Sequence, residues 1–168
     1  MAGVEASTSL KLCSPCDRIS FPSYPILMNT KRLLLAILAT FVTLYATAML
    51  IHGIWMNPVY KATASLWRPE DEMAAHGGWL FAGQLLAATT FTMIWAKGFA
   101  ATGRRQCAVI YGVCMGLFAQ ANTLISYAVQ PFTLEIVWKW VFAGVVQGVL
   151  LGLVVLWVYK PAPIRAEA

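Results

Sequence analysis

The fold is decided by the stretch at residues 136–159, which reads IVWKWVFAGVVQGVLLGLVVLWVY. Its one charged residue is Lys139, near its beginning. A helix rises 1.5 Å per residue, so about 20 mainly apolar residues cross the ~30 Å hydrocarbon layer of a bilayer. In lipid every backbone N–H and C=O must find its partner inside the segment. The stretch therefore predicts a transmembrane helix, in spite of its β-branched residues.

Three further runs have the same character, at residues 33–56, 73–95 and 107–129, and none of them contains a charged residue. The whole chain is 60% hydrophobic and 11% charged, with a mean hydropathy of +0.68. A soluble domain carries about a quarter charged residues. We therefore expect an all-α fold, an integral membrane four-helix bundle formed by residues 31–160.

Both ends of the chain are expected to lie outside this bundle. Residues 1–30 are mostly polar and aperiodic, which indicates a disordered tail or an overlong reading frame, and residues 161–168 form a second, cytoplasmic tail. A cleavable signal peptide is the competing interpretation, because Ala46-Thr-Ala48 fits a cleavage site. The apolar run continues to Met56, which is too long for a signal peptide and favours an uncleaved helix.

The basic residues predict the orientation, because the side of a membrane protein that is richer in Lys and Arg is cytoplasmic. One side collects Lys31, Arg32, Lys97, Arg104, Arg105, Lys160 and Arg165, whereas the other has Lys61, Arg68 and Lys139. We therefore expect a multi-pass protein of the cell inner membrane with a cytoplasmic N-terminus and a cytoplasmic C-terminus. The net charge of +5 then reflects orientation and predicts no nucleic-acid partner.

The first outer loop has a pattern of its own. Apolar side chains at Val59, Tyr60, Leu66 and Trp67 have helical spacing among polar neighbours, which predicts a short interfacial helix. Pro69 follows and is expected to open the second spanning helix, with three acidic residues in its first turn.

Small residues predict how the last two spans pack. Gly144, Gly148 and Gly152 form a GxxxGxxxG ridge in the fourth run. One face of the third run carries Gly112, Gly116, Ala119, Thr123 and Ser126. Helices in a bilayer associate through close backbone contact, which small residues permit. We expect these faces to pack within the bundle; the alternative is that the ridge forms a homodimer.

Amides are expected near the middle of three spans, at Gln84, Gln120 and Gln147, with Thr43 and Thr47 on the first. A buried amide without a partner is costly, so these side chains should bond across helices. The alternative is a polar permeation path. Since no Asp, Glu, His or Arg lies at that depth, a proton- or ion-coupled transporter is disfavoured.

Two histidines near the outer ends of their helices are the candidate metal ligands. Met49, His52 and Met56 share one side of the first span, and Met73 and His76 share a side of the second. Imidazole and thioether ligands suit copper, and two histidines at one level could hold a haem. The alternative is that each histidine bonds to backbone or water and the methionines fill gaps.

Other chemistry finds little support. Cys13 and Cys16 form a CSPC motif, which can be a redox pair or half of a zinc site, but neither histidine is near it in sequence. No hydrolase, metalloprotease or phosphate-loop motif is present, so we predict no catalytic residue and lean against an enzyme. Lys139 is expected to extend its ammonium group to the membrane interface or to pair with Glu135, four residues before it, rather than to act in catalysis.

Several stretches resemble a family of short four-span bacterial inner-membrane proteins that carries a domain of unknown function. They are Leu50-Ile-His-Gly53, the loop from Tyr60 to Leu66-Trp-Arg-Pro69 with Met73 after it, Gln147-Gly-Val-Leu-Leu-Gly152, and Tyr159-Lys-Pro161. The resemblance covers roughly residues 28–161. It implies four spans in a bacterial inner membrane and brings no ligand or activity with it.

Three functions remain open from the sequence. The first is a non-enzymatic membrane component without a cofactor, an accessory subunit or a homo-oligomer whose partners are the lipid bilayer and a larger membrane complex. The second is a haem- or copper-binding redox component that uses His52 and His76. The third is a small dimeric transporter or channel.

Overall fold

The computed structural model of the chain describes residues 28–160. The CSPC motif at Cys13 and Cys16 lies outside this range, as do most of the first predicted tail and all of the second, which includes Arg165. All regular secondary structure in the described range is helical. Four helices are long and apolar enough to cross a membrane, as predicted. They are α1 (Thr30–Leu50) with its continuation η1 (Ile51–Trp55), α4 (Gly77–Gly98), α5 (Arg105–Val129) and α6 (Leu134–Val158).

The shorter helices occupy the connections. The first loop contains a short helix, α2 (Asn57–Ala62), which includes Val59 and Tyr60 of the predicted helix. Leu66 lies in a separate 3₁₀ turn, η2 (Ala64–Leu66), and Trp67 follows it in extended conformation. A second 3₁₀ turn, η3 (Ala100–Thr102), precedes α5.

The prediction that Pro69 opens the second spanning helix is wrong. The three acidic residues belong to a separate helix, α3 (Glu70–Ala75), and the spanning helix α4 begins at Gly77. His76 lies between them with φ −95° and ψ 5°, outside the helical region. Two consecutive glycines, Gly77 and Gly78, follow it, and glycine costs about 1 kcal/mol relative to alanine inside a helix. The low helix propensity of these two glycines explains why the segment forms two helices, α3 and α4, where one was predicted.

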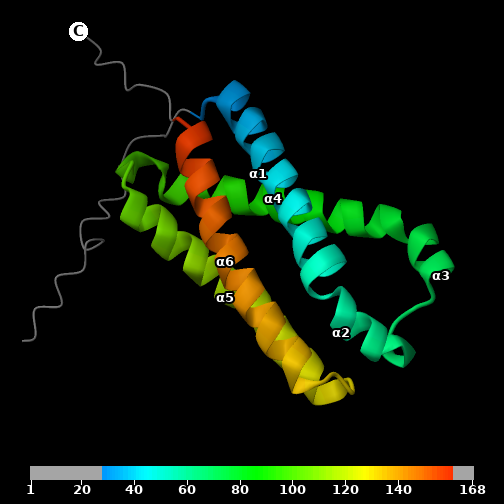
Figure 1. Cartoon of the computed structure of the whole chain (residues 1–168). Coiled ribbons are helices and arrows are strands. Elements are labelled where there is room, and N and C mark those ends of the chain that lie inside the picture. The colour runs from blue at the N-terminus through cyan, green and yellow to red at the C-terminus, as the bar shows by residue number, and fades with distance from the viewer. Residues whose placement is uncertain (1–27, 161–168) are drawn as a thin grey trace, which may run out of the picture.

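The four candidate spanning helices, called the spanning helices below, pack in the order α4, α1, α6, α5 (Figure 1). Helix α6 contacts both α1 and α5, and α4 packs mainly on α1. The beginning of α1 and the end of α6 lie at the same end of the bundle, which we call the terminal end (Figure 1). The opposite end, where α2 and the α5–α6 connection lie, is called the distal end.

The terminal end holds the main hydrophobic core. Trp95 has no exposed surface and packs among Phe91, Phe99 and Tyr111. The hydroxyl of Tyr111 donates a hydrogen bond to the backbone oxygen of Phe91, which joins α5 to α4. The same core includes Leu33 from α1 and Leu151 from α6, so all four long helices contribute to it.

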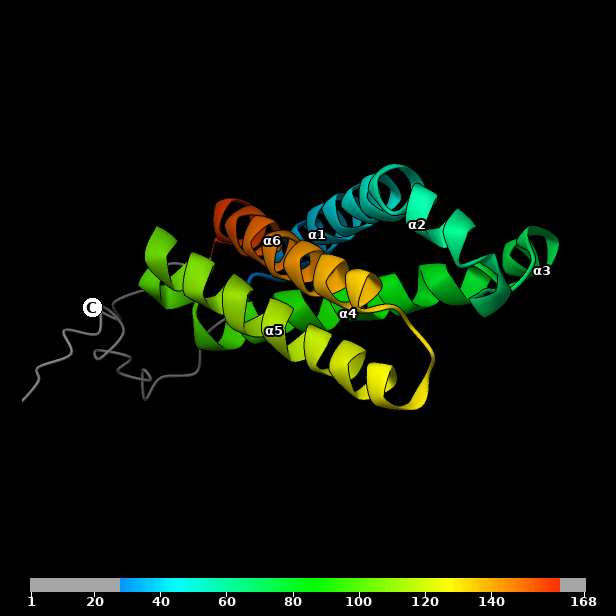
Figure 2. The same cartoon turned by 60° about the horizontal axis from the view of Figure 1, so that its bottom comes forward.

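Helix α4 joins this core only through its second half. Its buried residues run from Ala88 to Ala96, whereas Trp79 near its beginning is 79% exposed. Figures 1 and 2 both show the first half of α4 diverging from the distal end of α5. The bundle is therefore closed at its terminal end and splayed at its distal end.

Helices α5 and α6 pack through glycine, as predicted. A Cβ atom on Gly112 or Gly148 would overlap the backbone oxygen of the other residue, and a Cβ on Gly152 would overlap the backbone oxygen of Ala108. A Cβ on Gly116 would come within 2.8 Å of the Gly144 oxygen. The ridge of α6 is therefore used inside the bundle.

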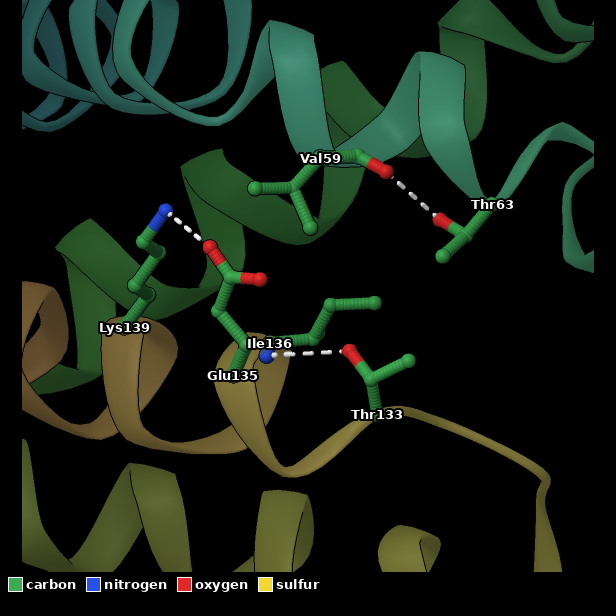
Figure 3. A network of polar contacts seen from close by, with 6 residues as sticks. All are labelled: Val59, Thr63, Thr133, Glu135, Ile136 and Lys139. Atoms are coloured by element: carbon green, nitrogen blue, oxygen red, sulfur yellow. Dashed lines mark hydrogen bonds and ion pairs between the residues drawn. The ribbon is translucent and has the colours of Figure 1, made fainter.

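At the distal end, α2 packs on the beginning of α6. Val59 and Met56 are buried against Ile136, which makes a second small core. Figure 3 shows Val59 above Ile136, with Lys139 reaching back to Glu135 on the same helix. The Lys139 Nζ to Glu135 Oε1 distance is 2.6 Å, which confirms the predicted pair.

Candidate functional site

A cavity of about 220 Å³ lies between η1, α5 and α6 and extends from mid-bundle toward the distal end. Helix α6 forms its floor, since α6 contacts α1 and α5 on either side. The lining residues are Ile51 and His52 from η1, Gln120 and Thr123 from α5, and Trp140, Ala143, Gly144 and Gln147 from α6. The cavity therefore gathers two of the three mid-span glutamines and one candidate histidine.

His52 lines the cavity from within a π-helical turn, η1. The backbone N–H of Met56 donates to the oxygen of Ile51, five residues earlier, at 2.8 Å. Such a turn adds one residue to the helix and rotates the side chains that follow, and it often marks a functional site. Here it lies at the end of the first span, where the chain leaves α1 for α2.

His52 belongs to a hydrogen-bonded chain with Tyr60 and Trp140. The Trp140 indole N–H donates to the Tyr60 hydroxyl oxygen at 2.8 Å, and the same hydroxyl lies 2.6 Å from Nδ1 of His52. An indole nitrogen can only donate, so Tyr60 accepts that bond. The Tyr60 O–H then donates to Nδ1 of His52, so the neutral imidazole carries its proton on Nε2.

An aromatic cluster surrounds the hydrogen bonds that join His52, Tyr60 and Trp140. The Tyr60 ring lies edge-on to Trp67 with centroids 5.1 Å apart, and Phe132 contacts both Trp67 and Trp140 at about 5.5 Å. Burial raises the pKa of the Tyr60 hydroxyl, although the bond from Trp140 opposes the shift. Tyr60 therefore keeps its proton at neutral pH and can donate it to His52.

Gln147 bonds across helices, as predicted. Its Nε2 donates to Thr47 Oγ1 at 2.6 Å and to the backbone oxygen of Leu44 at 3.3 Å. A backbone oxygen can only accept, so the amide orientation is fixed and both amide protons are used. The Oε1 atom of Gln147 is left as an acceptor beside the cavity.

Gln120 does not bond across helices. Its Oε1 accepts from the hydroxyl of Thr123 on the same helix at 2.7 Å. Its side chain lies so close to Gly144 that a Cβ there would overlap its Nε2. The Nε2 protons are bonded to no acceptor within residues 28–160, which leaves an amide donor at the cavity wall.

Gln84 is separated from the other two glutamines. It is on α4, does not line the cavity, and its Oε1 is buried without a hydrogen-bond donor in the described part of the chain. The three mid-span amides therefore have three different environments, and only Gln120 and Gln147 meet.

The two candidate metal ligands have different partners. His76 Nδ1 lies 2.8 Å from the backbone oxygen of Glu72, whereas His52 is engaged by Tyr60. Met56 is fully buried in the small distal core, where its thioether fills space. Within residues 28–160, no group of three or more His, Cys, Asp or Glu side chains could hold a metal ion. A haem or copper site shared by His52 and His76 stays a prediction.

The hydrogen-bonded chain and the cavity were not predicted from sequence. Tyr60 and Trp140 are 80 residues apart, and aromatic residues near the ends of spans are also typical of the membrane interface. The sequence contains one indication of this contact. His52, near the end of the first span, and Trp140, near the beginning of the last, are expected at a similar depth in the membrane.

The cavity offers hydrogen bonding and little else. None of its eight lining residues is Asp, Glu, Lys, Arg, Cys or Ser, so it lacks the usual acids, bases and nucleophiles other than His52 and the Thr123 hydroxyl. Comparisons of the chain with protein-family models, curated protein sequences and solved structures found no match.

Proposed function

We propose that this chain is a non-enzymatic multi-pass component of a bacterial inner membrane that holds a small uncharged molecule in the cavity between η1, α5 and α6. The observation that carries the proposal is the set of uncommitted polar atoms at one cavity. These are the Gln120 amide donor, the Gln147 Oε1 acceptor and the Nε2 atom of His52.

The charges of the two ends support an outward-facing distal end. The terminal end carries Lys31, Arg32, Lys97, Arg104, Arg105 and Lys160, whereas the distal segments carry only Lys61, Arg68 and Lys139, together with Glu70, Asp71, Glu72 and Glu135. The side with more Lys and Arg is expected to be cytoplasmic. Both termini are then cytoplasmic, and the cavity belongs to the outer half of the membrane.

An unfilled cavity of this kind is unfavourable in a bilayer. A polar group moved from water into an apolar environment without a partner costs roughly 1–3 kcal/mol. A bound molecule with hydrogen-bond acceptors would satisfy the amide donor of Gln120 and the Nε2 donor of His52. The volume of about 220 Å³ is smaller than the roughly 300–1,000 Å³ of typical drug-sized pockets, so the ligand is small.

Purified protein is expected to release a small molecule on denaturation, detected by mass spectrometry. Gln120→Leu should lower its occupancy severalfold, because one net hydrogen bond is worth about 0.5–1.5 kcal/mol. Gln120 bonds only within its own helix, so the variant should fold. Gln84→Leu is the matched control, since this amide does not line the cavity. Release of nothing but water and lipid by the wild-type protein, or equal occupancy in both variants, would contradict the proposal.

A small transporter or channel is the second candidate, because Gln120 and Gln147 form part of one polar cavity that reaches mid-span. A transporter would move a neutral solute into protein-containing vesicles faster than into empty ones. A binding component would retain its ligand and leave the vesicle permeability unchanged. Association with further copies or with a larger membrane complex stays a prediction; the exposed first half of α4 is the surface that would be available for it.

A further inference from the structure

We propose that the cavity accepts the head group of a membrane quinone, a flat uncharged ring with carbonyl oxygens on opposite sides. This inference deepens the proposed function and rests on it. It follows from the placement of the two uncommitted donors, the shape of the floor between them and the absence of charge in the lining.

The donors come from opposite walls. His52 is on η1 and Gln120 is on α5, and α6 lies between these two helices. The Tyr60 hydroxyl occupies Nδ1 of His52, so Nε2 carries the proton and is the nitrogen free to donate. The amide donor of Gln120 is free because the bond from Thr123 occupies its oxygen. Two donors on facing walls match a ligand with two acceptors at opposite ends.

The floor suits a flat ring. Ala143 adds only a methyl group to the floor, whereas the space over Gly144 is already taken by the amide of Gln120. Trp140 borders the same floor, and its indole N–H is already bonded to Tyr60. What Trp140 offers a ligand is therefore its aromatic surface, on which a ring can stack.

The charge of the lining favours a quinone over an ionised ligand. None of the eight lining residues is a carboxylate, an ammonium or a guanidinium group. An ion would therefore lose its hydration without gaining a counter-charge, whereas a neutral ring loses little. A quinone is also dissolved in the lipid that surrounds the spans, so it reaches the cavity without crossing an aqueous phase.

Isothermal titration of the purified full chain with a benzoquinone bearing one isoprenoid unit tests this. We expect saturable binding of one ring per chain, weakened roughly three- to tenfold by Gln120→Leu, as expected for the loss of one hydrogen bond. His52→Phe should weaken binding similarly while keeping a ring in the aromatic cluster. Gln84→Leu should bind like the wild type, and the 1,4-dimethoxybenzene analogue, which lacks carbonyl acceptors, should bind at least tenfold more weakly.

The outcomes separate this inference from the proposed function. If the quinone does not bind, or binds equally well to Gln120→Leu, the quinone assignment is overturned. In that case, a different neutral molecule released by the wild type and lost in Gln120→Leu would leave the proposed function standing. If the Gln120→Leu substitution changes the binding of neither a quinone nor any other molecule, both proposals fail together.

Discussion

Gly148→Ala is expected to destabilise the protein by about 1–3 kcal/mol, the usual cost of adding a methyl group to a filled interior. The new Cβ would overlap the backbone oxygen of Gly112 and lie 3.1 Å from the backbone of Gly116. Backbone atoms cannot rotate away as a flexible side chain can, so α5 and α6 would have to separate. The loss of thermal stability in detergent, followed by tryptophan fluorescence, measures the effect.

The chain contains a matched control for this substitution. Gly83 is also in a spanning helix, and a Cβ there would meet nothing within 4 Å. Alanine favours a helix over glycine by about 1 kcal/mol, so Gly83→Ala should be neutral or slightly stabilising. Equal destabilisation by the two substitutions would show that α5 and α6 do not pack through Gly148.

Trp95→Ala should cost about 3–5 kcal/mol, the range for removing a large buried aromatic side chain. Trp95 has no exposed surface and contacts both Phe99 and Tyr111, so its loss would leave a cavity where α4 meets α5. Because α4 joins the bundle through the terminal core, the second half of α4 should lose its contact with α5 before the other helices separate. Chemical denaturation of the purified protein gives the magnitude.

Two tryptophan controls separate packing from hydrogen bonding. Trp79 is 79% exposed, so Trp79→Ala should change stability by no more than about 0.5 kcal/mol. The indole nitrogen of Trp95 has no hydrogen-bond partner in the described structure, so Trp95→Phe should cost far less than Trp95→Ala. If Trp79→Ala were as harmful as Trp95→Ala, the account of the terminal core would be wrong.

The helices and the α5–α6 contact could be predicted because they follow from local composition. An apolar run of spanning length has few structural options in lipid, and glycines four residues apart share one helix face. The break at His76 was missed because the three acids after Pro69 read as the first turn of a long helix. The Gly77-Gly78 pair indicates a break in the helix at this point, because glycine is unfavourable inside a helix.

The candidate cavity could not be predicted because it depends on which helix faces meet. Gln84, Gln120 and Gln147 are equivalent by type and similar in depth, yet only the last two line one cavity. The reason is that α4 diverges from the bundle in its first half, and no residue pattern in α4 indicates this. Similarly, the contact of Tyr60 with Trp140 depends on how α2 folds back on α6.

Cysteine labelling in intact cells tests the central claim, that four spans cross the bilayer and leave the distal end outside. Gln130 follows α5 at the distal end, Gln106 is in the first turn of α5 at the terminal end, and both are exposed. After the native cysteines are replaced, a membrane-impermeant maleimide should label Gln130→Cys at once and Gln106→Cys only after permeabilisation. Equal labelling of both positions in intact cells would contradict the claim.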